Sequence, residues 1–144
     1  MIVRFRKLHP SAVAPHPAHG YTEDAGADLR SVETQYIGIG GTCAVRTALA
    51  IELPTGYQGE VRSRSGLAVR GIVVANSPGT IDPGFRGEIC VILHNHSDES
   101  LLVEPGDRIA QLVITRYEAV DWQEQDELAA SVRGESGFGA SGVK

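Results

Sequence analysis

Four short stretches of the chain hold the charged, hydroxyl and amide side chains that could do chemistry, at residues 25–31, 62–68, 76–88 and 105–112. Arginine side chains and the free N–H groups at the start of a helix bind phosphate. A positioned carboxylate can accept a proton from an attacking water molecule. These residue types together suit a negatively charged, phosphorylated substrate.

The stretch at 62–68 reads RSRSGLA, with two arginines, two serines and a glycine before the apolar start of a helix. A helix start presents free N–H groups to an anion, and Arg64 could bind a phosphate through both of its terminal nitrogens. The competing interpretation is that Ser65 only caps a surface helix. These residues alone leave both interpretations open.

Two other stretches place a polar side chain inside an apolar pattern. Asp28 lies in AGADLRS, and aspartate is disfavoured inside strands, so it needs a function or a partner such as Arg30 or a turn. Gln111 lies in the apolar part of PGDRIAQL, where a buried amide must find hydrogen-bond partners. The preceding Gly106-Asp107 pair is typical of a plain turn.

The stretch at 76–88 reads NSPGTIDPGFRGE and contains two turn signals within ten residues. Asp82 suits the first position of a β-turn, which by itself explains that residue. A turn does not explain why Asn76 and Phe85 stand on either side. A tight hairpin here could offer backbone N–H and C=O groups to a flat heterocycle while its tip holds a carboxylate.

The chain ends in RGESGFGASGVK, residues 133–144, with four glycines, one arginine and one phenylalanine. Glycine loses more conformational freedom on ordering than any other residue, so a disordered terminus is one interpretation. The other is a flap that closes on a ligand, with Phe138 to stack on a ring and Arg133 to pair with an anion.

Short strands must position these stretches. Alternating or apolar segments separated by Gly/Pro turns predict strands at 2–8, within 47–65, and at 72–76, 88–95, 101–105 and 108–120. The one short helix is expected at 65–71, and 121–132 reads as a polar arm. This pattern predicts an all-β barrel or sandwich.

The composition is that of one globular domain, with 42% hydrophobic and 22% charged residues. A formal charge of −5 argues against stable binding to nucleic acid or an anionic membrane. No membrane-spanning run or signal peptide is evident. Cys43 and Cys90 form no CxxC pair, which predicts a reducing, cytoplasmic location and two buried thiols.

In this order, the four stretches followed by RGESGFGASG resemble the five motifs of the trimeric dUTPases, the deoxyuridine triphosphate nucleotidohydrolases. The resemblance runs from about residue 3 to residue 141. It implies a jelly-roll-like β-barrel domain at 1–132, a flexible Gly-rich C-terminal arm at 133–144, and a homotrimer. Each active site would take the stretches at 25–31, 62–68 and 105–112 from one chain, the hairpin from a second and the arm from a third.

The resemblance also implies roles for individual residues. Asp82 matches the carboxylate that activates the attacking water and holds the deoxyribose 3′-OH. Asp28 matches a carboxylate linked through water to Mg²⁺. The uracil and sugar are assigned to Asn76, Gly79, Thr80, Ile81 and Phe85. The phosphates are assigned to Arg64, Ser65, Gly66 and Gln111. The arm contributes Arg133, Gly139 and Ser141 to the γ-phosphate and Phe138 to the base.

The implied reaction is the Mg²⁺-dependent hydrolysis of dUTP to dUMP and pyrophosphate by attack of water at the α-phosphorus. It would keep uracil out of DNA and supply dUMP for thymidylate synthesis. Three positions depart from the family pattern. Phe85 replaces a tyrosine but keeps its bulk, so discrimination against a ribose 2′-OH should survive. Ala140 replaces a serine, and Ser136 replaces a glycine.

Other functions fit the residues less well. A dCTP deaminase, which shares this fold, needs a glutamate where this chain has Ile92, and the H-x-E and P-C-x-x-C signature of zinc deaminases is absent. A non-catalytic nucleotide-binding protein would not need Asp82 and the arm, and a structural β trimer leaves all five motifs unexplained. His16 and His19, like His94 and His96, lack the further ligands of a metal site.

Overall fold

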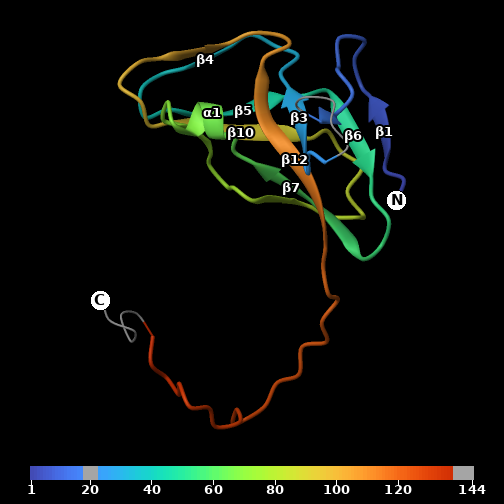
Figure 1. Cartoon of the computed structure of the whole chain (residues 1–144), viewed down its shortest axis with the longest axis vertical. Helices are drawn as coiled ribbons and strands as arrows, with labels where there is room; N and C mark the ends of the chain where they lie inside the picture. The colour runs from blue at the N-terminus through green and yellow to red at the C-terminus, as the bar shows by residue number, and fades with distance from the viewer. Residues whose placement is uncertain (18–22, 138–144) are drawn as a thin grey trace.

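The computed structural model of the chain describes residues 1–17 and 23–137, which form twelve short strands and one short helix (Figure 1). All strand pairs are antiparallel. The all-β fold that the turn-punctuated sequence predicts is therefore confirmed. The expected helix is also present, as the single turn α1 (Ser65–Ala68).

The largest sheet has five strands, in the order β2 (His16–Pro17), β3 (Gly26–Arg30), β12 (Arg108–Arg116), β7 (Tyr57–Arg62) and β9 (Gly79–Ile81). A second sheet contains β5 (Thr42–Arg46), β10 (Cys90–Asn95) and β8 (Ile72–Val74). Two further pairs are β1 (Arg4–Lys7) with β6 (Leu49–Glu52), and β11 (Leu101–Val103) with β4 (Gln35–Ile37). The four chemically interesting stretches all lie on or beside the first sheet.

The core is made of aliphatic side chains from every sheet. Its most completely buried members include Leu29, Val45, Leu49, Val91 and Leu93. In β10 the buried residues alternate with more exposed ones, as expected for a strand that covers the core with one face only.

The alternation in β10 also corrects one prediction. Cys90 precedes the buried Val91 and therefore faces outward, where it is exposed, and Cys43 is only partly buried. Both cysteines are free thiols. The prediction of two buried thiols is wrong because the apolar character of cysteine does not determine which face of a strand it occupies.

Strand β12 contains an irregularity that matters for the site. Its register against β3 shifts between Arg108 and Ala110. The two consecutive residues Ile109 and Ala110 are both buried, which breaks the usual alternation. This is the signature of a β-bulge, in which one strand carries an extra residue and a side chain is redirected.

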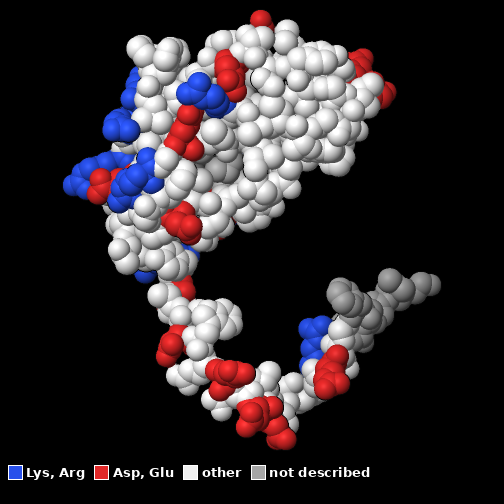
Figure 2. All heavy atoms as spheres, turned by 180° about the vertical axis from the view of Figure 1, so that it is seen from behind, with Lys and Arg blue, Asp and Glu red and all other residues white. Residues whose placement is uncertain are grey.

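After β12 the chain leaves the body of the protein, and residues 117–137 contain no strand or helix (Figure 1). Within residues 117–137, Val120, Trp122, Leu128 and Val132 are exposed. Residues 118–128 carry five acidic side chains and no lysine or arginine, and these acidic groups mark the arm in Figure 2. Within the described ranges, no helix has the length and apolar character needed to span a membrane.

Candidate active site

Three of the four stretches meet around one cavity of about 380 Å³. The residues that line it come from the segment before β3, from β3, from the start of α1 and from β12: Asp24, Ala25, Gly26, Asp28, Arg64, Ser65, Gly66 and Gln111. Every phosphate-binding and metal-linked residue predicted outside the hairpin and the arm is in this set. The fold thus brings together side chains that are far apart in the sequence.

Asp28 is the buried anion of this cavity, with 6% of its surface exposed. Arg64 donates from Nε to one carboxylate oxygen at 2.9 Å, and Arg108 donates from Nη1 to the other at 3.4 Å. Arg64 also donates from Nη1 to the backbone carbonyl of Arg108 at 3.2 Å. Arg30 instead donates to the carbonyl of Gly106 at 2.7 Å, so the proposed pairing of Asp28 with Arg30 is wrong.

Gln111 lies beside Asp28 in the lining of the cavity. It lies directly across from Asp28 in the β3–β12 ladder, and its Nε2 donates to the carbonyl of Ser63 at 3.0 Å. Gly26 makes room for this amide, because a Cβ at that position would overlap Gln111 Oε1. The amide, which is half-buried, therefore has the partner that its place in an apolar strand required.

The start of α1 leaves backbone donors available. Arg64 is the N-cap and has extended backbone angles, and no side chain caps the helix. The interpretation that Ser65 is the capping residue is therefore wrong. The first N–H groups of a helix have no acceptor within it, so those of Ser65 and Gly66 can point to a bound anion. An added Cβ at Gly66 would meet no atom within 4 Å, so the backbone is openly accessible there.

The segment at 76–85 differs from the predicted hairpin in its pairing. Its strand β9 pairs with β7, and residues 82–89, which would supply the second arm of a hairpin with Asp82 at its tip, contain no strand. β9 is an edge strand, and alternate backbone groups on the outer side of an edge strand are unpaired. The outward-facing backbone groups among Gly79, Thr80 and Ile81 can thus offer N–H and C=O groups to a flat ring.

Asn76 and Asp82 flank this edge strand. The Asn76 side chain packs over Gly79, where an added Cβ would lie 2.9 Å from Asn76 Nδ2. Asp82 is exposed, and its carbonyl accepts a hydrogen bond from the N–H of Phe85 at 3.0 Å, which confirms the predicted turn. Phe85 is 41% exposed. An exposed carboxylate and an exposed ring therefore follow the open edge.

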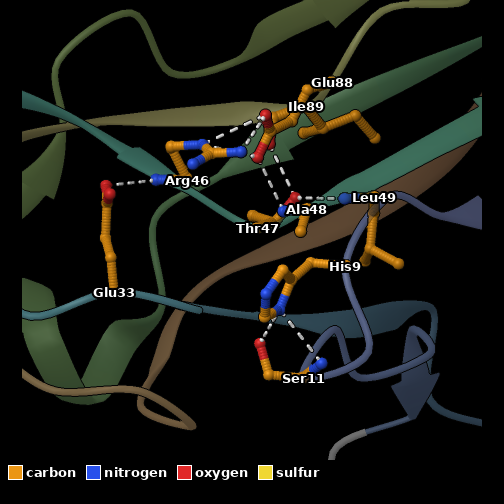
Figure 3. A network of polar contacts seen from close by, with 9 residues as sticks. All are labelled: His9, Ser11, Glu33, Arg46, Thr47, Ala48, Leu49, Glu88 and Ile89. Carbon is orange, nitrogen blue, oxygen red and sulfur yellow. Dashed lines mark hydrogen bonds and ion pairs between the residues drawn. The ribbon is translucent and has the colours of Figure 1, made fainter.

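Glu88, the last residue of the 76–88 stretch, joins this stretch to the body of the protein (Figure 3). Its carboxylate accepts hydrogen bonds from Arg46 Nε and Nη2, at 3.2 and 3.1 Å, and from the N–H of Ala48 at 2.8 Å. Ala48 is fully buried with a φ of 51°, a left-handed conformation that a non-glycine residue rarely adopts. The Glu88 carboxylate thus satisfies the backbone at the tight corner between β5 and β6.

The charges around Glu88 also affect their neighbours. The hydrogen bond and charge of Glu88 raise the pKa of Arg46. Burial raises the pKa of the Cys90 thiol, and the negative charge of Glu88 raises it further. Cys90 is therefore a poorly ionised thiol, which makes it a weak nucleophile.

Several predicted residues lie outside the cavity. None of the residues 76–85 lines it. Arg133 lies on the arm, where its Nε donates to the carbonyl of Ser136 at 2.9 Å. Phe138, Gly139 and Ser141 fall outside the described residues. A single chain therefore supplies a phosphate-sized cavity and a base-sized edge as two separate places.

The sequence interpretation missed two residues of the cavity framework. Arg108, which follows the predicted Gly106-Asp107 turn, was given no role, although it contacts Asp28. Ser63 accepts from Gln111 through its carbonyl, and its hydroxyl accepts from the N–H of Val74 at 2.8 Å. Its own N–H donates to Ser77 Oγ at 3.4 Å. The only signal for Ser63 was its place beside Arg64.

The donor set bears on metal binding. In the described part of the chain, no group of three or more His, Cys, Asp or Glu side chains could hold a metal ion. His94 instead packs edge-on against His96, with ring centroids 4.1 Å apart, and its Nδ1 lies 2.7 Å from Thr42 Oγ1. Both oxygens of Asp28 already carry an arginine contact. Asp28 therefore suits contact with a metal through water, with the other ligands coming from elsewhere.

The fold and the cavity define an all-β protein with an anion site built from β3, β12 and the start of α1. Comparison with known proteins makes this specific, since residues 12–142 match the model of the dUTPase family. The chain belongs to the dUTPase family.

Individual relatives agree with this assignment. The chain is 50% identical over 143 residues to a deoxyuridine 5′-triphosphate nucleotidohydrolase of Solibacter usitatus, covering 99% of this chain and 97% of the relative. It is 44% identical to the protein of the same name from Anaplasma marginale, covering 98% of both. Among solved structures, it resembles the Staphylococcus bacteriophage 80alpha dUTPase with dUPNHPP, with a TM-score of 0.90, 28% identity and 99% coverage of both chains.

Proposed function

We propose that this protein hydrolyses dUTP to dUMP and pyrophosphate by attack of water on the α-phosphorus. The observation that carries the proposal is the cavity in which Arg64, the free N–H groups of Ser65 and Gly66, and Gln111 surround a space of about 380 Å³. A triphosphate carries several negative charges, and this set of donors is suited to neutralise and orient it.

The remaining groups of the site divide the work by chemistry. The uracil ring is read by the open edge of β9 together with Asn76. Asp82 is the base that accepts a proton from the attacking water and also holds the sugar 3′-OH. A base contributes roughly 10²- to 10⁴-fold, so most of the acceleration comes from positioning and charge stabilisation.

Mg²⁺ is the cofactor that these residues fit. When bound to the triphosphate it would neutralise charge on the phosphate oxygens. Asp28 would hold it through a water molecule, because its two oxygens are already shared by Arg64 and Arg108. Asp28 thus serves two purposes, the positioning of arginines and an outer contact to the cation.

The separation of the cavity from the 76–85 segment supports a homotrimer with shared active sites. In the proposed assembly, one chain supplies the cavity, a second supplies the β9 edge with Asp82 and Phe85, and a third supplies the arm at 133–144. The arm brings Arg133, Phe138, Gly139 and Ser141 to the triphosphate and the base. An arm that leaves the body of its own chain, as residues 117–137 do, is suited to reach another.

The test is pyrophosphate release from dUTP, dTTP, dCTP and UTP, each with Mg²⁺. We expect dUTP to be preferred by roughly 10⁴-fold, because a hydrogen-bonding site leaves its own groups unpaired with the wrong base. The bulk of Phe85 is expected to reject UTP. Comparable turnover of dCTP or UTP would contradict the proposal. Tight binding of dUTP without turnover would instead indicate a non-catalytic nucleotide-binding protein.

A further inference from the structure

The β-bulge in β12 places Arg108 where a regular strand would not. Gln111 lies opposite Asp28 in the ladder, so these two side chains share one face of the sheet. Arg108 precedes Gln111 by three residues, and in a regular strand it would project from the other face. The register shift between Arg108 and Ala110 removes this difference and lets Arg108 reach Asp28. Bulges that redirect a side chain in this way are frequent next to active sites.

Arg108 does not line the phosphate cavity, but it contacts Asp28, which does. Its guanidinium shares the Asp28 carboxylate with Arg64, and its backbone carbonyl accepts a second hydrogen bond from Arg64. Arg64 therefore has two of its five N–H donors engaged, and the other three remain for a ligand within the described structure. The direction of those three donors depends on the Asp28–Arg108 framework.

The charges of this framework point the same way. Arg64 and Asp28 alone would sum to zero, because one positive and one negative charge cancel. Arg108 brings the sum of the three groups to +1, which offsets the negative charge of Asp24 on the same cavity. Without it, Arg64 alone would balance two carboxylates of the cavity, Asp28 and Asp24, which would disfavour an approaching triphosphate.

We infer that Arg108 is a positioning residue: together with Asp28 it holds Arg64 in the orientation that receives the phosphates. The inference rests on the proposed function for its choice of ligand. It assigns Arg108 no contact with the substrate.

The experiment compares R108Q and R108K with the unchanged protein. Two quantities are measured: kcat and KM for dUTP, and the Kd of a non-hydrolysable imido analogue of dUTP with Mg²⁺. For R108Q we expect KM and Kd to rise about tenfold with kcat within about threefold, because substrate and transition state depend equally on the orientation of Arg64. R108K keeps the charge and a single donor, so we expect it to restore KM and Kd to within about threefold.

Arg70 provides the matched control. It is an exposed arginine that lines a neighbouring cavity with Arg64 and Arg108. Within the described structure, it does not contact Asp28. R70Q removes the same charge without touching the framework, so its Kd should change less than threefold.

Three results would overturn the inference. The first is an R108Q variant that has a lower melting temperature but an unchanged Kd, because that is the behaviour of a purely structural residue. The second is an equal loss in R70Q and R108Q, which would indicate a general effect of charge. The third is a failure of R108K to recover affinity. Failure of the proposed function is distinguishable, since the unchanged protein would then not hydrolyse dUTP.

Discussion

Replacing Gly26 by alanine should damage activity far more than stability. Gly26 lies in β3 and does not have a positive φ, so its backbone suits alanine. The new Cβ would nevertheless overlap Gln111 Oε1 and lie 3.2 Å from Gln111 Cδ. The amide would have to move away and would lose its hydrogen bond to the carbonyl of Ser63.

The expected change in stability is small because two contributions oppose each other. Alanine reduces the conformational entropy of the unfolded chain, which stabilises by about 0.4–1 kcal/mol. Loss of the Gln111 hydrogen bond costs about 0.5–1.5 kcal/mol. The free energy of unfolding should therefore change by no more than about 1 kcal/mol, a shift in melting temperature of roughly 2–4 °C.

The expected change in activity is larger because Gln111 would be displaced from the phosphates. A hydrogen bond to a charged group is worth about 1.5–3 kcal/mol, which corresponds to a fall in kcat/KM of roughly 10- to 150-fold. The assay is pyrophosphate release from dUTP, with melting temperature measured on the same samples. Gly38→Ala is the control, because its added Cβ meets no atom within 4 Å.

A double variant decides whether the loss passes through Gln111. In a Gln111→Ala background the overlap no longer exists, so Gly26→Ala should cause no further loss of kcat/KM. An additive loss in the double variant, or full activity of Gly26→Ala alone, would refute the reasoning.

Three other predictions concern Asp82, the C-terminal arm at 133–144 and Cys90. Asp82→Asn should leave binding of the imido analogue intact and lower kcat by more than about tenfold, because the amide suits the turn but cannot accept a proton; near-normal turnover would reduce Asp82 to a turn residue. Deletion of residues 133–144 should abolish hydrolysis while the melting temperature is retained, and Phe138→Ala should lower kcat/KM by roughly 5- to 150-fold if stacking is worth about 1–3 kcal/mol. Full activity of the truncated protein would make the arm dispensable. Cys90, whose pKa is raised by burial and by Glu88, should react with iodoacetamide at pH 8 more slowly than the amino acid cysteine in solution. The folded pKa of Cys90 lies above its unfolded value, so its contribution to the free energy of unfolding is fully present below the ordinary pKa of 9.0 and is lost as the pH rises through the folded pKa. Urea unfolding at pH 8 and above measures this loss. A Cys90→Ser variant should not show it.

The sequence predicted the cavity residues better than it predicted their partners. Arg64, Ser65 and Gly66 are contiguous, and the short helix they begin has a local signal, so their arrangement could be read directly. Asp28 was identified by its misfit in an apolar strand, but Arg30, one of the alternatives considered, is not its partner. The true partners come from α1 and β12, and such long-range pairing leaves no local pattern.

Two other features depend on pairing in the same way. The bulge that brings Arg108 to Asp28 exists only relative to β3, and the sequence of β12 shows no turn residue at that point. The 76–85 segment reads as a hairpin because its turn residues are correctly placed. Its strand β9 nevertheless pairs with β7, since turn chemistry specifies where a chain bends but not which strand it then joins.

In the proposed trimer, the segment that follows β12 makes folding of the chain depend on its association. Residues 117–137 expose Val120, Trp122, Leu128 and Val132, so a single chain leaves part of its apolar surface in water. In the proposed trimer this surface is covered by other copies, and folding and association become one equilibrium. The free energy of unfolding then depends on protein concentration, and dilution acts on the protein in the same direction as heat.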